Sequence, residues 1–261
     1  MTGFGIGGGV MQYIWLIWSG AFLVPWAVLY FTRPTFRREM LRVSLATSLL
    51  ALTEPIFVPE YWNPPTLFDL AQRTGFDIES LIFCFAIGGI GAVAYNALAN
   101  KVLAEVPHAE RHSERHRWHR LAIVSPYLAF PMLYFLPWNP IYPGIVALAL
   151  GGIANVLCRP DLLRNTVVGG VLFLLLYAGF MLLLIIFAPG YIEQVWNLPA
   201  LSGVLLGGIP PEELAFGFTF GLYWAGIYEH FTWHRSTASA AVLAASHTHD
   251  GAAHSSTTVQ E

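Results

Sequence analysis

Hydrophobic and polar positions along the chain separate into seven apolar runs with polar residues gathered between them. A helix needs about 20 residues to cross the hydrocarbon core of a bilayer, because each residue adds about 1.5 Å. The runs have about this length. They predict transmembrane helices near residues 11–31, 41–59, 80–100, 121–138, 141–157, 165–188 and 208–233. The predicted fold class is therefore an all-α integral membrane protein with seven transmembrane helices.

Composition supports a membrane protein and charge predicts its orientation. Hydrophobic residues make up 56% of the chain and charged residues 11%, which leaves too few polar groups to cover a water-soluble surface. Basic residues collect on the cytoplasmic side of a membrane. Here they follow the first, third, fifth and seventh runs, and only Arg73 lies on the other side. We expect a protein of the cell (inner) membrane with its N-terminus outside and its C-terminus in the cytoplasm.

Two parts of the chain read as copies of one unit. Trp62–Asn63 precedes the third apolar run and Trp196–Asn197 precedes the seventh, and each run opens on an acidic segment, 76–81 or 209–214. Such duplication predicts two parallel three-helix repeats joined by a linker helix. The expected domains are a Gly-rich leader 1–10, a first repeat 11–104, a charged linker with helix four 105–140, a second repeat 141–235 and a disordered tail 236–261.

Carboxylates at one predicted membrane boundary are the candidate chemical groups. Glu79, Glu212 and Glu213 begin helices in the two copies, and Glu54 lies near the end of the second apolar run. Acids in a first helical turn also stabilise the helix dipole, which is the structural alternative. An ionisable group at membrane depth is nevertheless a functional candidate by default. The occurrence of these acids in both copies favours function.

Aromatic and amide side chains accompany the acids in both copies. Phe83 and Phe216 lie four residues after Glu79 and Glu212, on the same helical face. Aromatic faces attract cations, although interfacial anchoring would also place rings at this depth. An acid in a dry aromatic pocket suits protonation of an alkene in a lipid-soluble substrate. The substrate-binding candidates are Trp62, Trp196, Phe83, Phe216, Asn63, Asn197, Tyr95 and Tyr228.

Pro210–Pro211–Glu212–Glu213 fits the motif P-x-E-[ED] at a helix start, and Asp77–Ile78–Glu79–Ser80 keeps only its first Glu. On these residues the chain resembles the integral-membrane lycopene cyclases, of the heterodimeric or fused type with tandem domains. The resemblance implies a cofactor-free isomerisation, in which an acid protonates the terminal double bond of an acyclic carotenoid and the cation closes to an ionone ring. It implies Glu212 as the leading proton donor, with Glu213 and Glu79 as its partners. Glu54, which the pattern places in a buried position without an equivalent acid in the second copy, is a second-rank candidate.

The expected partners are a lipid-soluble polyene and membrane lipid, without nucleic acid. A homo-oligomer and contacts with other enzymes of carotenoid biosynthesis remain open. The alternative function is a non-enzymatic membrane transporter or a carotenoid- or lipid-binding subunit, because duplicated helical units also build transport pathways. A retinal protein is disfavoured because the only lysine, Lys101, lies at the predicted cytoplasmic end of helix three.

Histidines recur every four residues in the linker, at His108, His112 and His116, with His119 nearby. One helical face would bring such imidazoles together for a metal, but the interleaved charges favour a solvated linker. Cys84 and Cys158 lie at opposite predicted ends of the membrane, so we interpret them as packing residues. No metal site is predicted.

Overall fold

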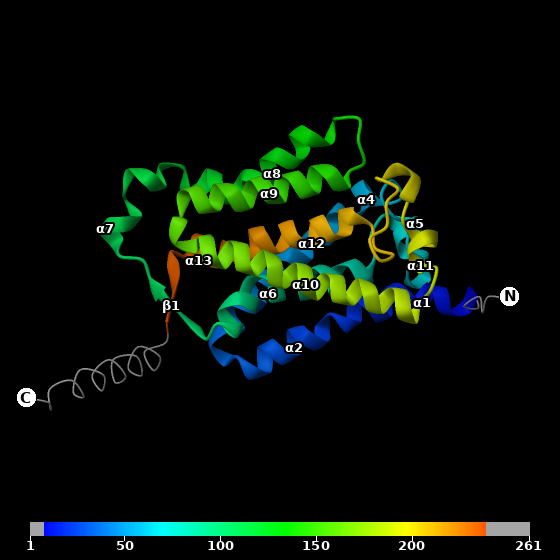
Figure 1. Ribbon diagram of the computed structural model, residues 1–261, viewed down its shortest axis with the longest axis horizontal. Coiled ribbons are helices and arrows are strands. Elements are labelled where there is room, and N and C mark those ends of the chain that lie inside the picture. Colours follow the sequence, from blue (N-terminus) through cyan, green and yellow to red (C-terminus); the bar gives the residue numbers. More distant parts are fainter. Residues whose placement is uncertain (1–7, 239–261) are drawn as a thin grey trace, which may run out of the picture.

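The computed structural model describes residues 8–238, which are mostly helical (Figure 1). The long helices run roughly along the longest axis of the molecule. α1 (Gly8–Ala21), α5 (Leu70–Thr74) and α11 (Tyr191–Val195) lie at one end, and the strands β1 (Lys101–Glu105) and β2 (His234–Ala238) lie at the other. The described chain therefore begins and finishes at opposite ends of the bundle.

The remaining elements are short connecting turns and the helices of the bundle. The 3₁₀ turns are η1 (Pro34–Phe36), η2 (Leu49–Thr53), η3 (Leu67–Asp69), η4 (Glu114–Trp118), η5 (Pro160–Leu162) and η6 (Leu198–Ala200). The other helices are α2 (Leu23–Thr32), α3 (Arg37–Ser48), α4 (Glu54–Phe57), α6 (Ile78–Leu98), α7 (His108–Arg111), α8 (His119–Tyr134), α9 (Ile141–Cys158), α10 (Leu163–Phe187), α12 (Pro211–Trp224) and α13 (Ile227–Thr232).

Five helical segments among the described residues are long and apolar enough to cross a membrane. They are Met11–Thr32, Pro34–Phe57, Ile78–Leu98, Ile141–Cys158 and Pro160–Phe187. Four of the seven predicted runs have bounds similar to those of these segments. The second segment begins earlier than its predicted run, at Pro34. The protein is thus a membrane protein, while seven spans and a parallel repeat stay predictions.

The last predicted run is not one helix. Residues before Pro210 form a loop, α12 ends at Trp224, and a turn at Ala225–Gly226 separates α12 from α13. Glycine weakens a helix by about 1 kcal/mol relative to alanine, which favours a break here. The first run also divides, into α1 and α2. Pro25 has no N–H to donate to the carbonyl of Ala21, where α1 ends.

Two other predictions are corrected at the ends of the chain. Residues 236–238, expected in a disordered tail, belong to β2, which pairs antiparallel with β1 in the register Lys101 to Ala238. The described chain is therefore not purely helical. Gly8–Val10, expected in the leader, belong to α1. The rest of the predicted leader and tail, 1–7 and 239–261, lies outside the described residues.

Small residues let the central helices approach closely. A Cβ at Gly88 of α6 would collide with the side chain of Thr47 of α3. A Cβ at Gly221 of α12 would collide with the side chain of Phe173 and the backbone of Gly169, both in α10. Helices in lipid associate largely through such backbone proximity, because burial of apolar surface gives little advantage there. These contacts bring α3 against α6 and α10 against α12.

Candidate active site

A cavity of about 520 Å³ lies among the helices. More than half of the residues that line it are aromatic. The lining comes from α1, η2, α4, the loop before η3, α6, α8, α9, α10, the α10–α12 connection and α12. Cavities of this size hold small ligands or one part of a larger one. No histidine, lysine or arginine is among the described residues of the lining. The cavity is therefore an aromatic, weakly polar chamber.

Glu54 and Glu213 are the carboxyl groups among the described residues of this lining. Glu213 belongs to the first turn of α12 and is 3% exposed. Its carboxyl group accepts hydrogen bonds from the hydroxyls of Tyr61 and Tyr177 and from Nε1 of Trp196, the last at 2.6 Å. Both carboxyl oxygens are thus held in fixed positions by three donors from three separate parts of the chain.

Tyr61 keeps its proton as one of these donors. Burial raises the pKa of Tyr61 well above its usual value, and the nearby Glu213 raises it further, because a phenolate would stand beside another negative charge. The hydroxyl can therefore donate to Glu213 over the whole physiological pH range. Trp196 also contacts Tyr61, since its Nε1 lies 3.2 Å from the Tyr61 hydroxyl.

The two Trp–Asn segments pair with each other and so position these donors. Trp62 and Trp196 form an antiparallel backbone bridge, and their ring centroids are 5.5 Å apart. The N–H of Asn63 donates to the carbonyl of Val195 at 2.8 Å, and the N–H of Asn197 donates to the carbonyl of Tyr61 at 2.9 Å. Satisfied backbone groups let Tyr61 and Trp196 lie buried in this junction. It closes one end of the cavity.

Glu54 opens α4 and is 7% exposed. Trp62 and Ser80, which also line the cavity, are its polar neighbours. Its Oε1 has no hydrogen-bond partner among the described residues. Asp77 lies near it and caps α6 by accepting from the N–H of Ser80. Burial raises the pKa of Asp77, which weakens the charge on this cap.

Glu79 and Glu212 are buried but do not line the cavity. Oε1 of Glu79 accepts from the N–H of Leu67 at 2.7 Å. Oε1 of Glu212 accepts from the hydroxyl of Tyr142 and from the N–H of Ser202, both at 2.8 Å. Each of these carboxyl groups therefore holds a connecting segment against the helix that it begins.

The predicted substrate-binding residues divide between the cavity and other places. Trp62, Trp196, Phe83 and Phe216 line the cavity. Asn63, Asn197, Tyr95 and Tyr228 do not. Asn63 accepts from Gln72, and the Asn197 side chain donates to the carbonyl of Glu60 at 3.0 Å. Tyr95 is buried in the second half of α6, and Tyr228 accepts from Arg42.

Sequence reasoning missed several functional candidates. Tyr61 and Tyr177 were not selected, although a hydroxyl within an apolar helix is the signal that Tyr177 offers. Two further buried carboxyl groups, Glu39 and Glu229, lie away from the cavity lining. Glu229 accepts from Asn96, Asn165 and Ser236.

The cavity also reaches the outer surface beside α8. Tyr127, Tyr134 and Phe135 belong to its lining, yet Phe135 is 84% exposed and the two tyrosines are exposed as well. Exposed apolar side chains on a membrane protein face lipid tails. The apolar lining of the cavity therefore continues to the outer surface beside α8.

Comparison with known proteins bears on the second part of the chain. The model of a family described as lycopene cyclase matches residues 139–231, a range that contains α9 to α12, Trp196 and Glu213. No curated protein and no solved structure gives a significant match. The match supports a carotenoid cyclase function. Over residues 139–231, this chain is therefore similar to the lycopene cyclase family.

Proposed function

We propose that the protein cyclises the end group of an acyclic carotenoid by cofactor-free acid catalysis, with lycopene as the type of substrate. The observation that carries this proposal is the aromatic cavity in which Glu54 and Glu213 supply the carboxyl groups of the described lining. A cyclase needs an acid to start the reaction, a base to finish it, and walls that tolerate a cation between the two steps. The lining offers all three.

In the proposed reaction Glu54, in its protonated form, gives a proton to the terminal double bond of the end group. The resulting tertiary cation is attacked by the double bond five carbons further along, which forms the six-membered ring and moves the positive charge into it. Glu213, as a carboxylate, removes a ring proton and leaves a new double bond. Substrate and product have the same composition, so the reaction needs no oxidant or reductant.

The assignment of the two roles rests on hydrogen bonding. Glu213 is surrounded by three donors, which stabilise a carboxylate and fix its oxygens toward the cavity. Glu54 keeps one oxygen without a partner among the described residues. With fewer donors around it, the Glu54 carboxyl group is the less stabilised of the two as a carboxylate. Glu79 and Glu212 support the loops around the site and do not contact the substrate in this proposal.

The aromatic lining has a direct role in the proposal. Phe83 and Phe216 lie in the walls beside Trp62, Trp196 and Tyr177. A ring face stabilises a nearby cation by about 0.5 kcal/mol when exposed and about 2 kcal/mol or more when desolvated. Exclusion of water also prevents capture of the cation as an alcohol. The cavity volume suits one end group, with the polyene extending along α8 into lipid.

The test is expression in a bacterial strain that accumulates lycopene, with the pigments separated by chromatography and identified by mass. Wild type should give products of unchanged mass that absorb at shorter wavelength. Glu213→Gln should give none, while Glu193→Gln, at an exposed position on α11, should behave as wild type. Unchanged lycopene with wild-type protein present in the membrane would contradict cyclisation of this substrate and favour the transport or binding alternative.

A further inference from the structure

We propose that His116, His119 and Cys158 bind a divalent zinc ion at the end of the bundle opposite the junction of the two Trp–Asn segments. These residues come from η4, from the first turn of α8 and from the last turn of α9. One ligand atom from each lies within 4.8 Å of the other two. The site would be separate from the cavity, and the inference does not depend on the proposed reaction.

The distances within the cluster agree with tetrahedral zinc. Sγ of Cys158 lies 3.6 Å from Nδ1 of His116 and 3.7 Å from Nδ1 of His119. Zinc binds sulfur at about 2.3 Å and nitrogen at about 2.0–2.1 Å, so a sulfur and a nitrogen ligand of a tetrahedral site lie about 3.5–3.6 Å apart. A thiol has one proton and can donate to only one of the two nitrogens. A zinc-bound thiolate has both imidazoles as neighbours at these distances.

Local structure explains how the two histidines meet. His116 and His119 are three residues apart, and side chains at this spacing eclipse each other in a 3₁₀ turn such as η4. Trp233 then fixes the rings. It stacks on His119 with centroids 3.8 Å apart and meets His116 edge-on at 5.0 Å. Thiolate and imidazole together are a ligand set typical of zinc among the divalent ions.

Neighbouring polar groups complete the surroundings. Nε2 of His230 lies 3.0 Å from Nδ1 of His119, and Nδ1 of His230 lies 2.8 Å from Oδ1 of Asn155. This contact with an amide oxygen requires a proton on Nδ1, which leaves the Nε2 lone pair directed at Nδ1 of His119. Zinc binding would replace the proton that His119 shares with His230, and water would take the fourth position of the ion, because His230 is outside the group of mutually close ligand atoms.

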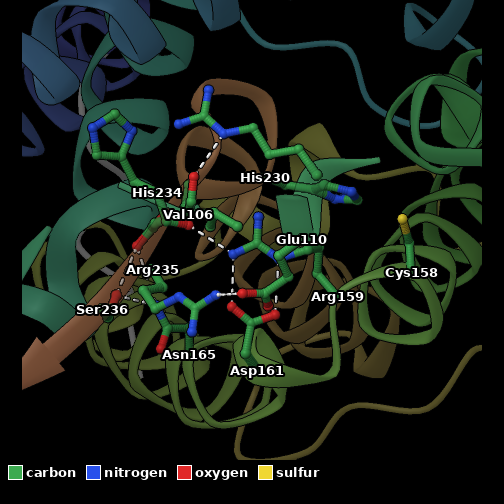
Figure 2. Close-up of polar contacts among 12 residues, drawn as sticks. Val106, Glu110, Cys158, Arg159, Asp161, Asn165, His230, His234, Arg235 and Ser236 are labelled. Atoms are coloured by element: carbon green, nitrogen blue, oxygen red, sulfur yellow. Dashed lines mark hydrogen bonds and ion pairs between the residues drawn. The ribbon is translucent and has the colours of Figure 1, made fainter. Parts of the chain in front are cut away.

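The positive charge of Arg159, next to the cluster, is compensated by a carboxylate. Arg159 follows Cys158 directly and is 1% exposed. Its guanidinium pairs with the carboxylate of Asp161 at 2.6 Å and also donates to the carbonyl of His234 (Figure 2). A bound zinc ion would tie the linker to α8 and α9 at this end, where β1 and β2 also pair. Such an ion stabilises the folded state because it does not bind the unfolded chain equally well.

The experiment uses the full chain in detergent, purified without a histidine tag and stripped of metal. Cobalt(II) is the probe, because thiolate ligation gives a charge-transfer band in the near ultraviolet and tetrahedral geometry gives strong visible bands. Wild type should bind one cobalt per chain with both signals, and one equivalent of zinc should remove them. Absence of the charge-transfer band in wild type would overturn the proposal without any variant.

Variants separate this site from adventitious binding. Cys158→Ser should lose the charge-transfer band, and His119→Gln should bind at least about tenfold more weakly. Cys84→Ser and His112→Gln are matched controls that should keep the wild-type spectrum, because Cys84 lines the cavity and His112 lies outside the cluster. A band that survives in Cys158→Ser, or disappears equally in Cys84→Ser, would also contradict the assignment.

Discussion

Trp62 and Trp196 pair backbone to backbone, and each indole has one of the two cavity carboxyl groups as a neighbour. Trp196 donates its Nε1 hydrogen to Glu213 at 2.6 Å, and Trp62 is a polar neighbour of Glu54. The junction thus connects the two halves of the proposed acid–base pair. Any movement of one tryptophan would be transmitted through the bridge to the other.

Trp196→Phe removes one donor from Glu213 and keeps most of the aromatic wall. A hydrogen bond to a charged group contributes about 1.5–3 kcal/mol, so product formation should fall about tenfold or more. Trp138→Phe is the matched control, because the Trp138 indole is exposed and donates to the backbone of Leu133. Pigment yield per unit of membrane protein measures the difference. Equal yields from the two variants would show that the bond to Glu213 has no catalytic importance.

Phe216→Leu tests the role of the ring separately from packing. Leucine keeps an apolar side chain in the wall and loses the π face, which should reduce the rate roughly 2- to 30-fold, as expected for about 0.5–2 kcal/mol of cation–π stabilisation. Phe216→Tyr should retain most activity. Phe187→Leu, at an exposed position of α10, should have no effect. A loss in Phe216→Tyr as large as in Phe216→Leu would point to packing as the cause.

Gly88→Ala tests the close approach of α3 and α6. Its methyl group would collide with Thr47, and overpacking of this kind costs about 1–3 kcal/mol. Gly179→Ala is the matched control in α10, because a methyl group at this position would meet no heavy atom of the described residues within 4 Å. Thermal unfolding of purified protein in detergent should show a lower midpoint for Gly88→Ala only. An equal midpoint in both variants would mean that the two helices adjust without cost.

The apolar runs predicted most membrane helices because spanning length leaves a clear pattern in the sequence. They could not place the interruption between α12 and α13, since Ala225 and Gly226 are also acceptable inside a helix. The strands were missed for a related reason. β1 and β2 are five residues each and lie far apart in the sequence, so their pairing depends on the tertiary fold.

The sequence accounts for part of the cavity lining. Repetition in the sequence pointed to Trp62, Trp196, Phe83 and Phe216, all of which line the cavity. It could not choose between adjacent acids. Residues three and four apart share a helical face, so Phe216 is compatible with both Glu213 and Glu212. In the predicted first repeat the corresponding choice is between Ser80 and Glu79, and Ser80 is the one in the lining.

Glu212 and Glu213 therefore provide the sharpest test, because the sequence favours Glu212 as the leading catalytic acid, whereas Glu213 lines the cavity and is the proposed base. Glu212→Gln should keep product formation within about tenfold of wild type, since the amide oxygen can still accept from Tyr142 and Ser202. Glu213→Gln should reduce it by at least about 100-fold, the usual contribution of a general base. Each variant replaces a carboxylate by an amide at one of two adjacent positions. The comparison is direct when both variants reach similar levels in the membrane. The reverse order of losses would return the leading role to Glu212 and would require the substrate to bind outside the aromatic cavity.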